Sequence, residues 1–249
     1  MSESVPPNPY VGPRSLHYGE NIFGREREAR QLVELLIAER IVLLYSPSGA
    51  GKTSLIEAAL IRAIERRFQI LPVMRVSQEA VGEVRPANRY VFSALLSLER
   101  DFPSNPISLD ELGRMTFGDY LSRREAERAE KRAALLIFDQ FEEILTVDPM
   151  KPDEKTEFFN QVGDAMRDLK RWALFSMRED HVAALDPYLR LIPTRLKATF
   201  RLDLLNVAGA RAAIEEPARS MGVTFTPEAT GKLVDDLREV LVRSGAGTT

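Results

Sequence analysis

The stretch that decides the fold is Ser46-Pro47-Ser48-Gly49-Ala50-Gly51-Lys52-Thr53, which follows the apolar run 41–45 and precedes the helix-forming run 55–64. It matches the phosphate-binding pattern G-x-x-x-x-G-K-[ST], except that serine takes the place of the first glycine. A strand before such a loop and a helix after it let backbone N–H groups and the helix N-terminus converge on an anion. The sequence therefore predicts a phosphate-binding loop between a buried strand and a buried helix.

The residue types in this loop suit a nucleotide triphosphate. Gly49 and Gly51 permit unusual φ values and a close approach of phosphate oxygens to the backbone. Lys52 is expected to neutralise the β- and γ-phosphates, and the Thr53 hydroxyl to ligate Mg²⁺. The nucleotide-binding residues predicted here are Ser48, Gly49, Ala50, Gly51, Lys52, Thr53 and Ser54.

The alternative interpretation of the loop is a glycine-rich connection whose lysine is a solvated surface charge. It leaves unexplained why two glycines and an alanine occupy a turn between two buried elements. Ser46 departs from the pattern because serine adopts positive φ less readily than glycine does. The phosphate-loop interpretation is favoured, and the first turn of the loop is where its geometry is expected to differ.

Acidic residues follow a second apolar strand, in the sequence LLIFDQFEE at residues 135–143. Asp139 directly follows the strand, at the edge where parallel α/β sheets bind ligands, and is predicted to hold the metal together with Thr53. Glu142 and Glu143 are candidates to orient or deprotonate an attacking water. Their alternative role is to stabilise the first turn of a helix through its dipole.

Arg178 directly follows the predicted strand 172–177 and should point into the same crevice as Lys52 and Asp139. An arginine there would contact the γ-phosphate, a contact on which turnover can depend strongly. The alternative is an ion pair with Glu179 or Asp180 in the next turn.

Strands and helices alternate along the chain, which predicts an α/β fold with a mostly parallel sheet covered by helices on both faces. Hydrophobic periodicity predicts strands at 41–45, 70–76, 133–138, 172–177 and 199–204, and helices at 25–39, 55–64, 90–98, 117–132, 158–169, 207–216 and 227–242. The proline-rich residues 1–21 read as a lead-in segment, either ordered by contacts or flexible. Residues 22–205 form the core, residues 206–243 a small helical appendage, and residues 244–249 a flexible tail.

Composition limits the possible partners. The chain of 249 residues has 34 basic and 37 acidic side chains, a net charge of −3, which gives no overall attraction to nucleic acid or an anionic membrane. The absence of cysteine removes disulfides and thiolate metal sites and fits a reducing compartment. Apolar runs fall far short of the roughly 20 residues of a membrane helix, and the first ten residues do not resemble a signal peptide. We therefore expect a cytoplasmic protein.

One predicted helix is strongly charged, which raises the alternative of a nucleic-acid-dependent ATPase. Its basic residues are Arg123, Arg124, Arg128, Lys131 and Arg132. Glutamates at 125, 127 and 130 lie between them, so a self-paired solvated face is favoured and nucleic acid is disfavoured as a partner. A GTPase is also disfavoured, because no N-K-x-D guanine motif follows the loop.

Several motifs in order resemble the STAND class of P-loop NTPases within the AAA+/ASCE fold, and most closely the bacterial novel STAND group, related to NACHT and apoptotic ATPases. They are FGRE at 23–26, SPSGAGKTSL at 46–55, LLIFDQFEE at 135–143, FSMRED at 175–180 and IEEPA at 214–218. The lead-in NPYVGPRSL at 8–16 is also similar to the entry segment of that group. The resemblance covers nearly the whole chain from Asn8.

The resemblance implies a three-layer sandwich with a parallel sheet of order 5-1-4-3-2, followed by a helical lid. It also implies that ATP or ADP binds with Mg²⁺ at the end of the first strand and that slow hydrolysis serves as a conformational switch. By analogy Phe23 and Gly24 lie near the adenine, Pro217 belongs to the adenine side of the lid, and Arg178 acts as a sensor of the γ-phosphate. Pro217 alternatively begins a turn after a helix. Gln140 stands where many relatives have an acid, which disfavours fast hydrolysis.

The same resemblance implies partners, because relatives continue into a winged-helix domain and a sensor. Neither His17 nor His181 can take the role of the winged-helix histidine. We therefore expect the nucleotide-binding part of a larger signalling or defence protein, acting through homo-oligomers or through fused or partner effector and sensor domains. The alternative is a non-catalytic module whose surface is read by a partner when nucleotide binds.

Overall fold

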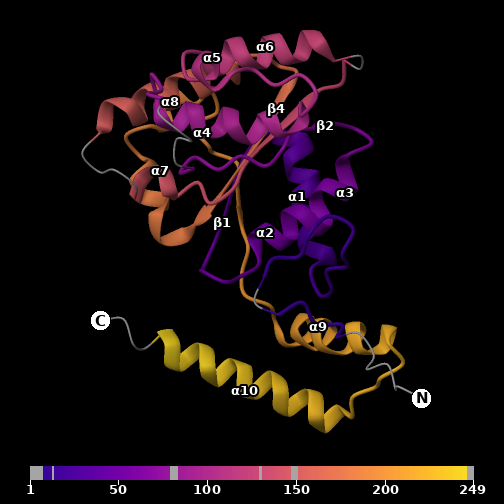
Figure 1. Cartoon of the computed structure of the whole chain (residues 1–249). Coiled ribbons are helices and arrows are strands. Elements are labelled where there is room, and N and C mark those ends of the chain that lie inside the picture. Colours follow the sequence, from indigo (N-terminus) through magenta and orange to yellow (C-terminus); the bar gives the residue numbers. More distant parts are fainter. Residues whose placement is uncertain (1–7, 13, 79–83, 129–130, 147–150, 246–249) are drawn as a thin grey trace.

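A computed structural model describes residues 8–12, 14–78, 84–128, 131–146 and 151–245 (Figure 1). It contains a five-stranded sheet in which every pair of neighbours is parallel. The strands are β1 (Ile41–Ser46), β2 (Gln69–Ile70), β3 (Ala134–Phe138), β4 (Arg171–Arg178) and β5 (Thr199–Arg201). Their order, β2-β3-β4-β1-β5, confirms the predicted order 5-1-4-3-2 when the sheet is followed from its other edge.

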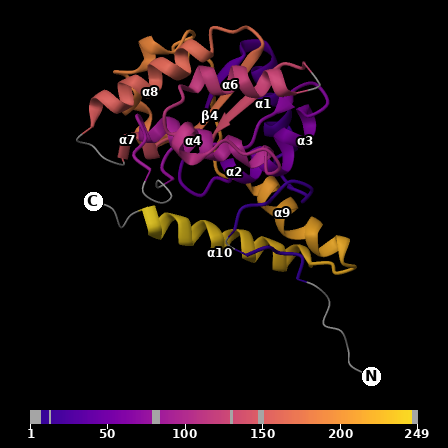
Figure 2. The ribbon, with the colours of Figure 1, turned by 45° about the horizontal axis from the view of Figure 1, so that its top comes forward.

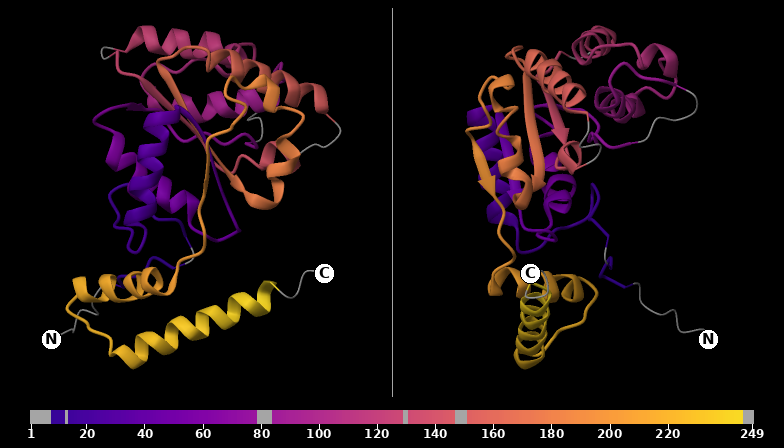
Figure 3. Two further views of the ribbon diagram at one scale, coloured as in Figure 1. Left: turned by 180° about the vertical axis from the view of Figure 1, so that it is seen from behind. Right: turned by 90° about the vertical axis from the view of Figure 1, so that its left-hand side faces the viewer.

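Helices cover both faces of the sheet, which lies between two helical layers when seen edge-on (Figure 3, right). One face carries α4 (Arg89–Leu98), α5 (Leu109–Leu112), α6 (Phe117–Glu127), α7 (Glu143–Thr146) and α8 (Pro152–Ala165) (Figure 2). The other face carries α1 (Glu26–Glu39) and one continuous helix made of α2 (Lys52–Ser54), the π-helical η1 (Leu55–Leu60) and α3 (Ile61–Ile64). The predicted helices at 25–39 and 55–64 are thus confirmed.

The alternation of strand side chains divides the apolar residues between the two layers. In β3, Leu136 and Phe138 pack against the α4, α6 and α8 layer, whereas Leu135 and Ile137 pack against α1 and α2–α3. All five β3 residues are buried, which explains why this strand reads as an uninterrupted apolar run rather than an alternating one.

The prediction of one continuous strand at 70–76 was wrong. Regular pairing covers only β2, and Met74 then makes a single parallel bridge to Phe138. Between them lies Pro72, which has no N–H to donate to the ladder. The ladder resumes when Met74 donates to the Ile137 carbonyl at 2.8 Å.

The predicted strand 199–204 is also shorter, ending at Arg201. Leu202 still donates to the Tyr45 carbonyl at 2.9 Å. The next carbonyl, that of Asp203, instead accepts a hydrogen bond from the Arg25 guanidinium at 2.7 Å, so the chain leaves the sheet here.

The predicted helix 117–132 ends early, at Glu127. Arg128 is extended, with φ −86° and ψ 136°, and its side chain reaches Asp101 at 3.1 Å. Residues 129–130 lie outside the described residues. Ala134 then donates to the Lys170 carbonyl at 2.9 Å, which shows that the chain has turned into the sheet.

A pair of helices, α9 (Val207–Ser220) and α10 (Pro227–Gly245), lies to one side of the α/β body and is joined to it by the segment after β5 (Figures 1 and 3). Asn206 caps α9 by accepting from the Gly209 N–H at 2.8 Å. The predicted helix ends at 216 and 242 were early. The first helix continues through Pro217 to Ser220, and the second continues to Gly245. Residues 246–249 of the predicted tail lie outside the described residues.

Short 3₁₀ segments complete the described fold: η2 (Glu99–Asp101), η3 (Glu179–Leu185) and η4 (Leu189–Leu191). In the described part of the chain, no helix combines the length and the apolar character needed to cross a membrane.

Candidate functional site

The phosphate-binding loop connects β1 to α2 in the conformation that its glycines predict. Gly49 and Gly51 have φ of +78° and +92°, where a side chain would be strained. Ser46 is the last residue of β1, paired with Arg178 of β4, and its φ is not positive. Serine is therefore tolerated at the first pattern position, since the strand extends through it.

The Ser46 side chain contributes a contact that glycine could not make. Lys52 Nζ donates to Ser46 Oγ at 2.9 Å, and this hydroxyl donates in turn to the Pro47 carbonyl at 2.7 Å. The ammonium group is thereby held over the loop. Burial lowers the pKa of Lys52 from its usual 10.5, while the negative charges of Glu142 and Asp139 oppose that shift.

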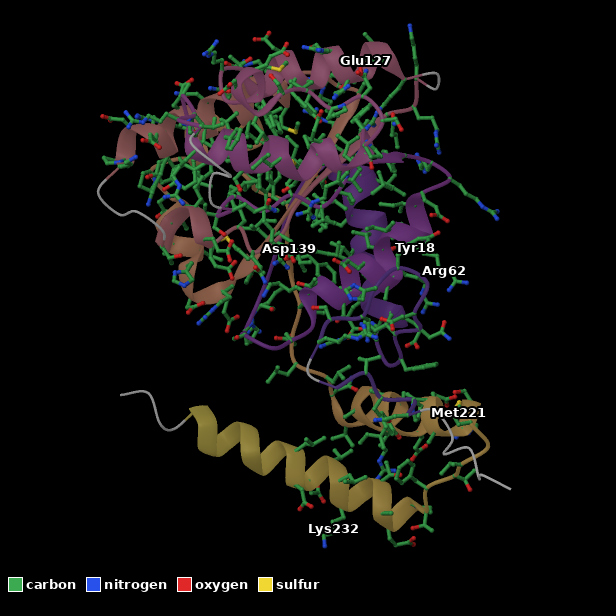
Figure 4. All side chains as sticks on the ribbon, in the orientation of Figure 1. Tyr18, Arg62, Glu127, Asp139, Met221 and Lys232 are labelled. Atoms are coloured by element: carbon green, nitrogen blue, oxygen red, sulfur yellow. The ribbon has the colours of Figure 1, made fainter. Side chains whose placement is uncertain are left out.

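Asp139 lies at the same edge of the sheet as the loop. Thr53 Oγ1 donates to Asp139 Oδ2 at 2.8 Å. Asp139, which is labelled in Figure 4, is buried, at 2% exposure. Its other oxygen accepts from Ser176 Oγ of β4 at 2.9 Å. Sequence reasoning missed Ser176, although a serine inside the apolar run of β4 is a signal of a buried polar partner.

A turn after β3 precedes the two neighbouring glutamates, whose side chains have different partners. Gln140 adopts φ of +54° there, and Phe141 donates to the Ser176 carbonyl at 2.9 Å. Glu142 lines the loop cleft and accepts from the Arg178 backbone N–H at 3.2 Å. Glu143 begins α7 and binds the Ser77 hydroxyl instead.

Arg178 ends β4 at the mouth of the cleft. Its guanidinium forms a two-pronged ion pair with Asp180, with Nε–Oδ1 and Nη2–Oδ2 distances of 3.1 and 2.6 Å. The ion-pair alternative for this residue is therefore present in the structure. The Arg178 side chain also lines the cleft, so its position is compatible with this ion pair and with a contact to the γ-phosphate.

A cleft of about 320 Å³ joins these groups. Among the described residues, its lining comprises Arg14, Ser15, Ser48, Gly49, Gly51, Lys52, Thr53, Ser54, Asp139, Gln140, Glu142 and Arg178. Arg14 and Ser15 come from the lead-in and were not predicted as site residues. Ala50 is absent from this described lining, because it is buried and its carbonyl points to Arg25.

Arg25 is another residue that the sequence did not single out for the site. The residue is 4% exposed, and its guanidinium donates to the Ala50 carbonyl of the loop at 2.9 Å and to the Asp203 carbonyl at 2.7 Å. Arg25 lies in the FGRE motif at 23–26, but the sequence does not reveal its partners, because they are backbone carbonyls remote in the chain. It ties the loop to the segment that leads to α9.

The three residues assigned to the adenine by analogy lie apart from the lining of this cleft. Phe23 is half-buried, and Gly24, with φ of +77°, packs against Gly209 of α9. Gly24 and Gly209 also line a second hollow, of about 630 Å³, beside α1 and β5. Pro217 lies within α9 rather than at the start of a turn after it.

Comparison with known proteins agrees with the geometry. The sequence profile described as Novel STAND NTPase 1 matches residues 9–246. The chain belongs to this family. The predicted resemblance is therefore confirmed, and the chain is a nucleotide-binding NTPase module of this family. No protein of curated function matches the sequence.

Solved structures share the fold of this STAND NTPase at low sequence identity. The Walker-type ATPase PABY2304 of Pyrococcus abyssi has a TM-score of 0.64 and 16% identity, over 90% of this chain and 65% of that one. The Aeropyrum pernix ORC2 protein, in ADPNP–ADP complexes, has a TM-score of 0.54 and 16% identity over 84% and 54%. The Aeropyrum pernix ORC1 protein, in complex with DNA, has 0.51 and 14% over 80% and 50%. This STAND NTPase chain thus spans less than two thirds of each.

Proposed function

We propose that this chain is an ATP-binding, slowly ATP-hydrolysing switch module, the nucleotide-binding part of a larger signalling or defence protein of the cytoplasm. The observation that carries the proposal is the 2.8 Å contact between Thr53 Oγ1 and Asp139 Oδ2 beside Lys52. A hydroxyl from the helix that begins at the loop and a carboxylate directly after β3 meet where the loop would present the phosphates of a nucleotide.

This pair of oxygen donors fits Mg²⁺. Within the described residues no group of three or more His, Cys, Asp or Glu side chains could hold a metal ion by itself. Mg²⁺ suits a sparse oxygen site, because it keeps several waters and usually takes one or two carboxylates together with substrate phosphates. Thr53 and Asp139 would hold the ion, which when bound supplies positive charge to the phosphate oxygens.

The other cleft residues divide the remaining work of phosphoryl transfer, which is chiefly positioning and charge stabilisation. Lys52 would bind the β- and γ-phosphates, and Glu142 would orient the attacking water and accept its proton. Arg178 would contact the γ-phosphate after exchanging its carboxylate partner Asp180 for phosphate. Gln140 cannot act as a second acid beside Asp139. The Arg178–Asp180 ion pair must open before Arg178 can contact phosphate. Both features favour slow turnover.

Calorimetric measurement of nucleotide binding tests the proposal. Calorimetric titration with ATP and Mg²⁺ should show binding by the wild type, weaker binding of GTP, and an affinity for ATP lowered roughly tenfold or more in Lys52→Ala. Lys232→Ala is the matched control, since Lys232 is exposed on α10, away from the loop (Figure 4). Equal ATP binding by wild type and Lys52→Ala would remove the basis of the proposal.

The second candidate is a non-catalytic module. In it, ATP orders the fold, and a partner or a second copy of the chain binds the surface of the ordered state. Gln140 favours it. Release of phosphate that is lost in Glu142→Gln while ATP binding is retained would count against this version.

A nucleic-acid-dependent ATPase is disfavoured by the ion pairs of α6. Arg124 is buried against Glu99, Arg123 pairs with Glu111 at 2.6 Å, and Arg128 pairs with Asp101 at 3.1 Å. These charges are already partnered within the fold. Nucleic acid added at low salt should leave the ATPase rate unchanged.

A further inference from the structure

Residues 16–18 of the lead-in lie along the helix that begins at the phosphate loop. The Leu16 N–H donates to Ser54 Oγ at 3.0 Å, and His17 Nδ1 lies 2.9 Å from Glu57 Oε2. Tyr18 Oη then donates to Glu65 Oε2 at 2.7 Å, beside α3 (Figure 4). Three successive contacts to α2–α3 fix the segment in place, and they start one residue after Thr53.

Arg14 stands just before this anchored stretch, at the mouth of the loop cleft. Its side chain is 44% exposed and lines the cleft with Lys52 and Arg178. The cleft therefore has three cations, whereas its carboxylates are Asp139 and Glu142. Those two carboxylates already accept hydrogen bonds from Thr53, Ser176 and the Arg178 backbone. Two of the cations are paired with carboxylates outside this lining, Arg14 with Glu20 and Arg178 with Asp180, so a multiply charged anion would bind by taking the place of those carboxylates.

The guanidinium of Arg14 is folded back onto its own segment. It donates to both carboxylate oxygens of Glu20, at 2.8 and 2.5 Å, and to the Ser15 carbonyl at 2.8 Å. Arg14, and after it the His17 N–H, lower the pKa of Glu20 to about 2, so the carboxylate is ionised at physiological pH. A two-pronged arginine–carboxylate pair has the geometry with which arginine also binds phosphate.

We propose that Arg14 is a nucleotide-phosphate ligand, and that Glu20 is the partner that holds it when no nucleotide is bound. This inference rests on the proposed function and extends the site from the loop to residues 14–20. When nucleotide binds, the Arg14 guanidinium exchanges the Glu20 carboxylate for a phosphate group of higher negative charge. The anchored contacts of Leu16 and His17 keep the segment in position during that exchange.

The test compares the affinities of four variants for ATP and ADP by calorimetry. Arg14→Ala should weaken both nucleotides roughly tenfold, the loss of one charge-assisted phosphate contact, and Arg14→Lys should recover only part of it. Glu20→Gln frees the guanidinium yet can still accept from the His17 N–H, so it should bind ATP at least as tightly as wild type. Arg30→Ala, an exposed arginine on α1, is the charge-matched control.

Trypsin cleavage after Arg14 gives an independent readout that does not require a variant. ATP with Mg²⁺ should slow this cleavage in the wild-type chain, because Arg14 is then held in the cleft by phosphate, whereas Glu20 holds it on its own partly exposed segment. Wild-type affinity in Arg14→Ala would overturn the inference. So would a Glu20→Gln affinity as low as that of Arg14→Ala, because the pair would then only hold the segment. If Lys52→Ala alone loses ATP binding, the proposed function stands and the role of Arg14 fails.

Discussion

Gly24 and Gly209 pack so closely that a Cβ atom placed on Gly24 would lie 2.4 Å from the carbonyl oxygen of Gly209. The first glycine directly precedes Arg25, which holds the phosphate loop, and the second lies in the first turn of α9. The α/β body therefore contacts the helical pair through two residues without side chains. One step along the chain, Arg25 reaches the loop itself.

Substitution of Gly24 by alanine should push α9 away from the body. The contact that a Cβ makes is with backbone, which cannot yield as a flexible side chain can, so we expect a loss of more than about 2 kcal/mol in unfolding free energy. Gly222→Ala is the matched control, because Gly222 has the same φ of +77° with open space around it. Urea denaturation compares the two variants. Equal losses would show that only the backbone conformation matters and that the close contact does not.

Arg25→Ala should weaken both stability and nucleotide binding. It leaves the buried Ala50 carbonyl without its guanidinium donor and removes the part-buried contact with the Asp203 carbonyl, a loss of about 1–3 kcal/mol in unfolding free energy. Because Ala50 belongs to the loop, the affinity for ATP should fall as well. Chemical denaturation and calorimetry measure the two effects, with the exposed Arg30→Ala as control. Lower stability with unchanged affinity would mean that Arg25 does not shape the loop.

Asp139→Asn should remove the dependence of ATP binding on Mg²⁺. The amide keeps one acceptor oxygen for a hydroxyl but loses the negative charge that a hard cation requires. We expect the affinity in the presence of Mg²⁺ to fall roughly tenfold or more, toward the value measured with a chelator. Asp164→Asn on the exposed face of α8 is the control. An undiminished response to Mg²⁺ would exclude Asp139 as its ligand.

The elements that the sequence predicted best are those that depend on residues close together in the chain. The apolar runs of β1 and β3, the loop glycines and the acid after β3 each follow from neighbouring residues. The break at Pro72 was accessible in principle, since a missing N–H is visible in the sequence. The partners of Arg25 and the position of Arg14 were not, because the fold brings them together from distant segments and backbone carbonyls carry no side-chain signal.

The affinity for ATP should fall at alkaline pH because of Lys52. Burial lowers the pKa of its ammonium group in the nucleotide-free chain, whereas bound phosphates favour the charged form and raise it. Affinity is full below the nucleotide-free pKa and is lost as the pH rises through it, and between the two pKa values binding takes up a proton. Titrations from neutral pH to about 10, in two buffers of different ionisation enthalpy, measure both quantities. A flat affinity with no proton uptake would contradict the assignment.

Glu142→Gln and Glu143→Gln should separate two roles that the sequence left together. Glu142 lines the cleft and accepts from the Arg178 N–H, whereas Glu143 is bound to Ser77 at the start of α7. Glu142→Gln should therefore lower kcat by about 10²–10⁴ and leave the affinity for ATP nearly unchanged, the pattern of a lost general base. Glu143→Gln should keep kcat and lower the unfolding free energy by about 1 kcal/mol, since its hydrogen bond to Ser77 is weakened. Phosphate-release assays and urea denaturation of both variants decide between them. The reverse pattern would assign the base to Glu143 and require α7 to reorient when nucleotide binds.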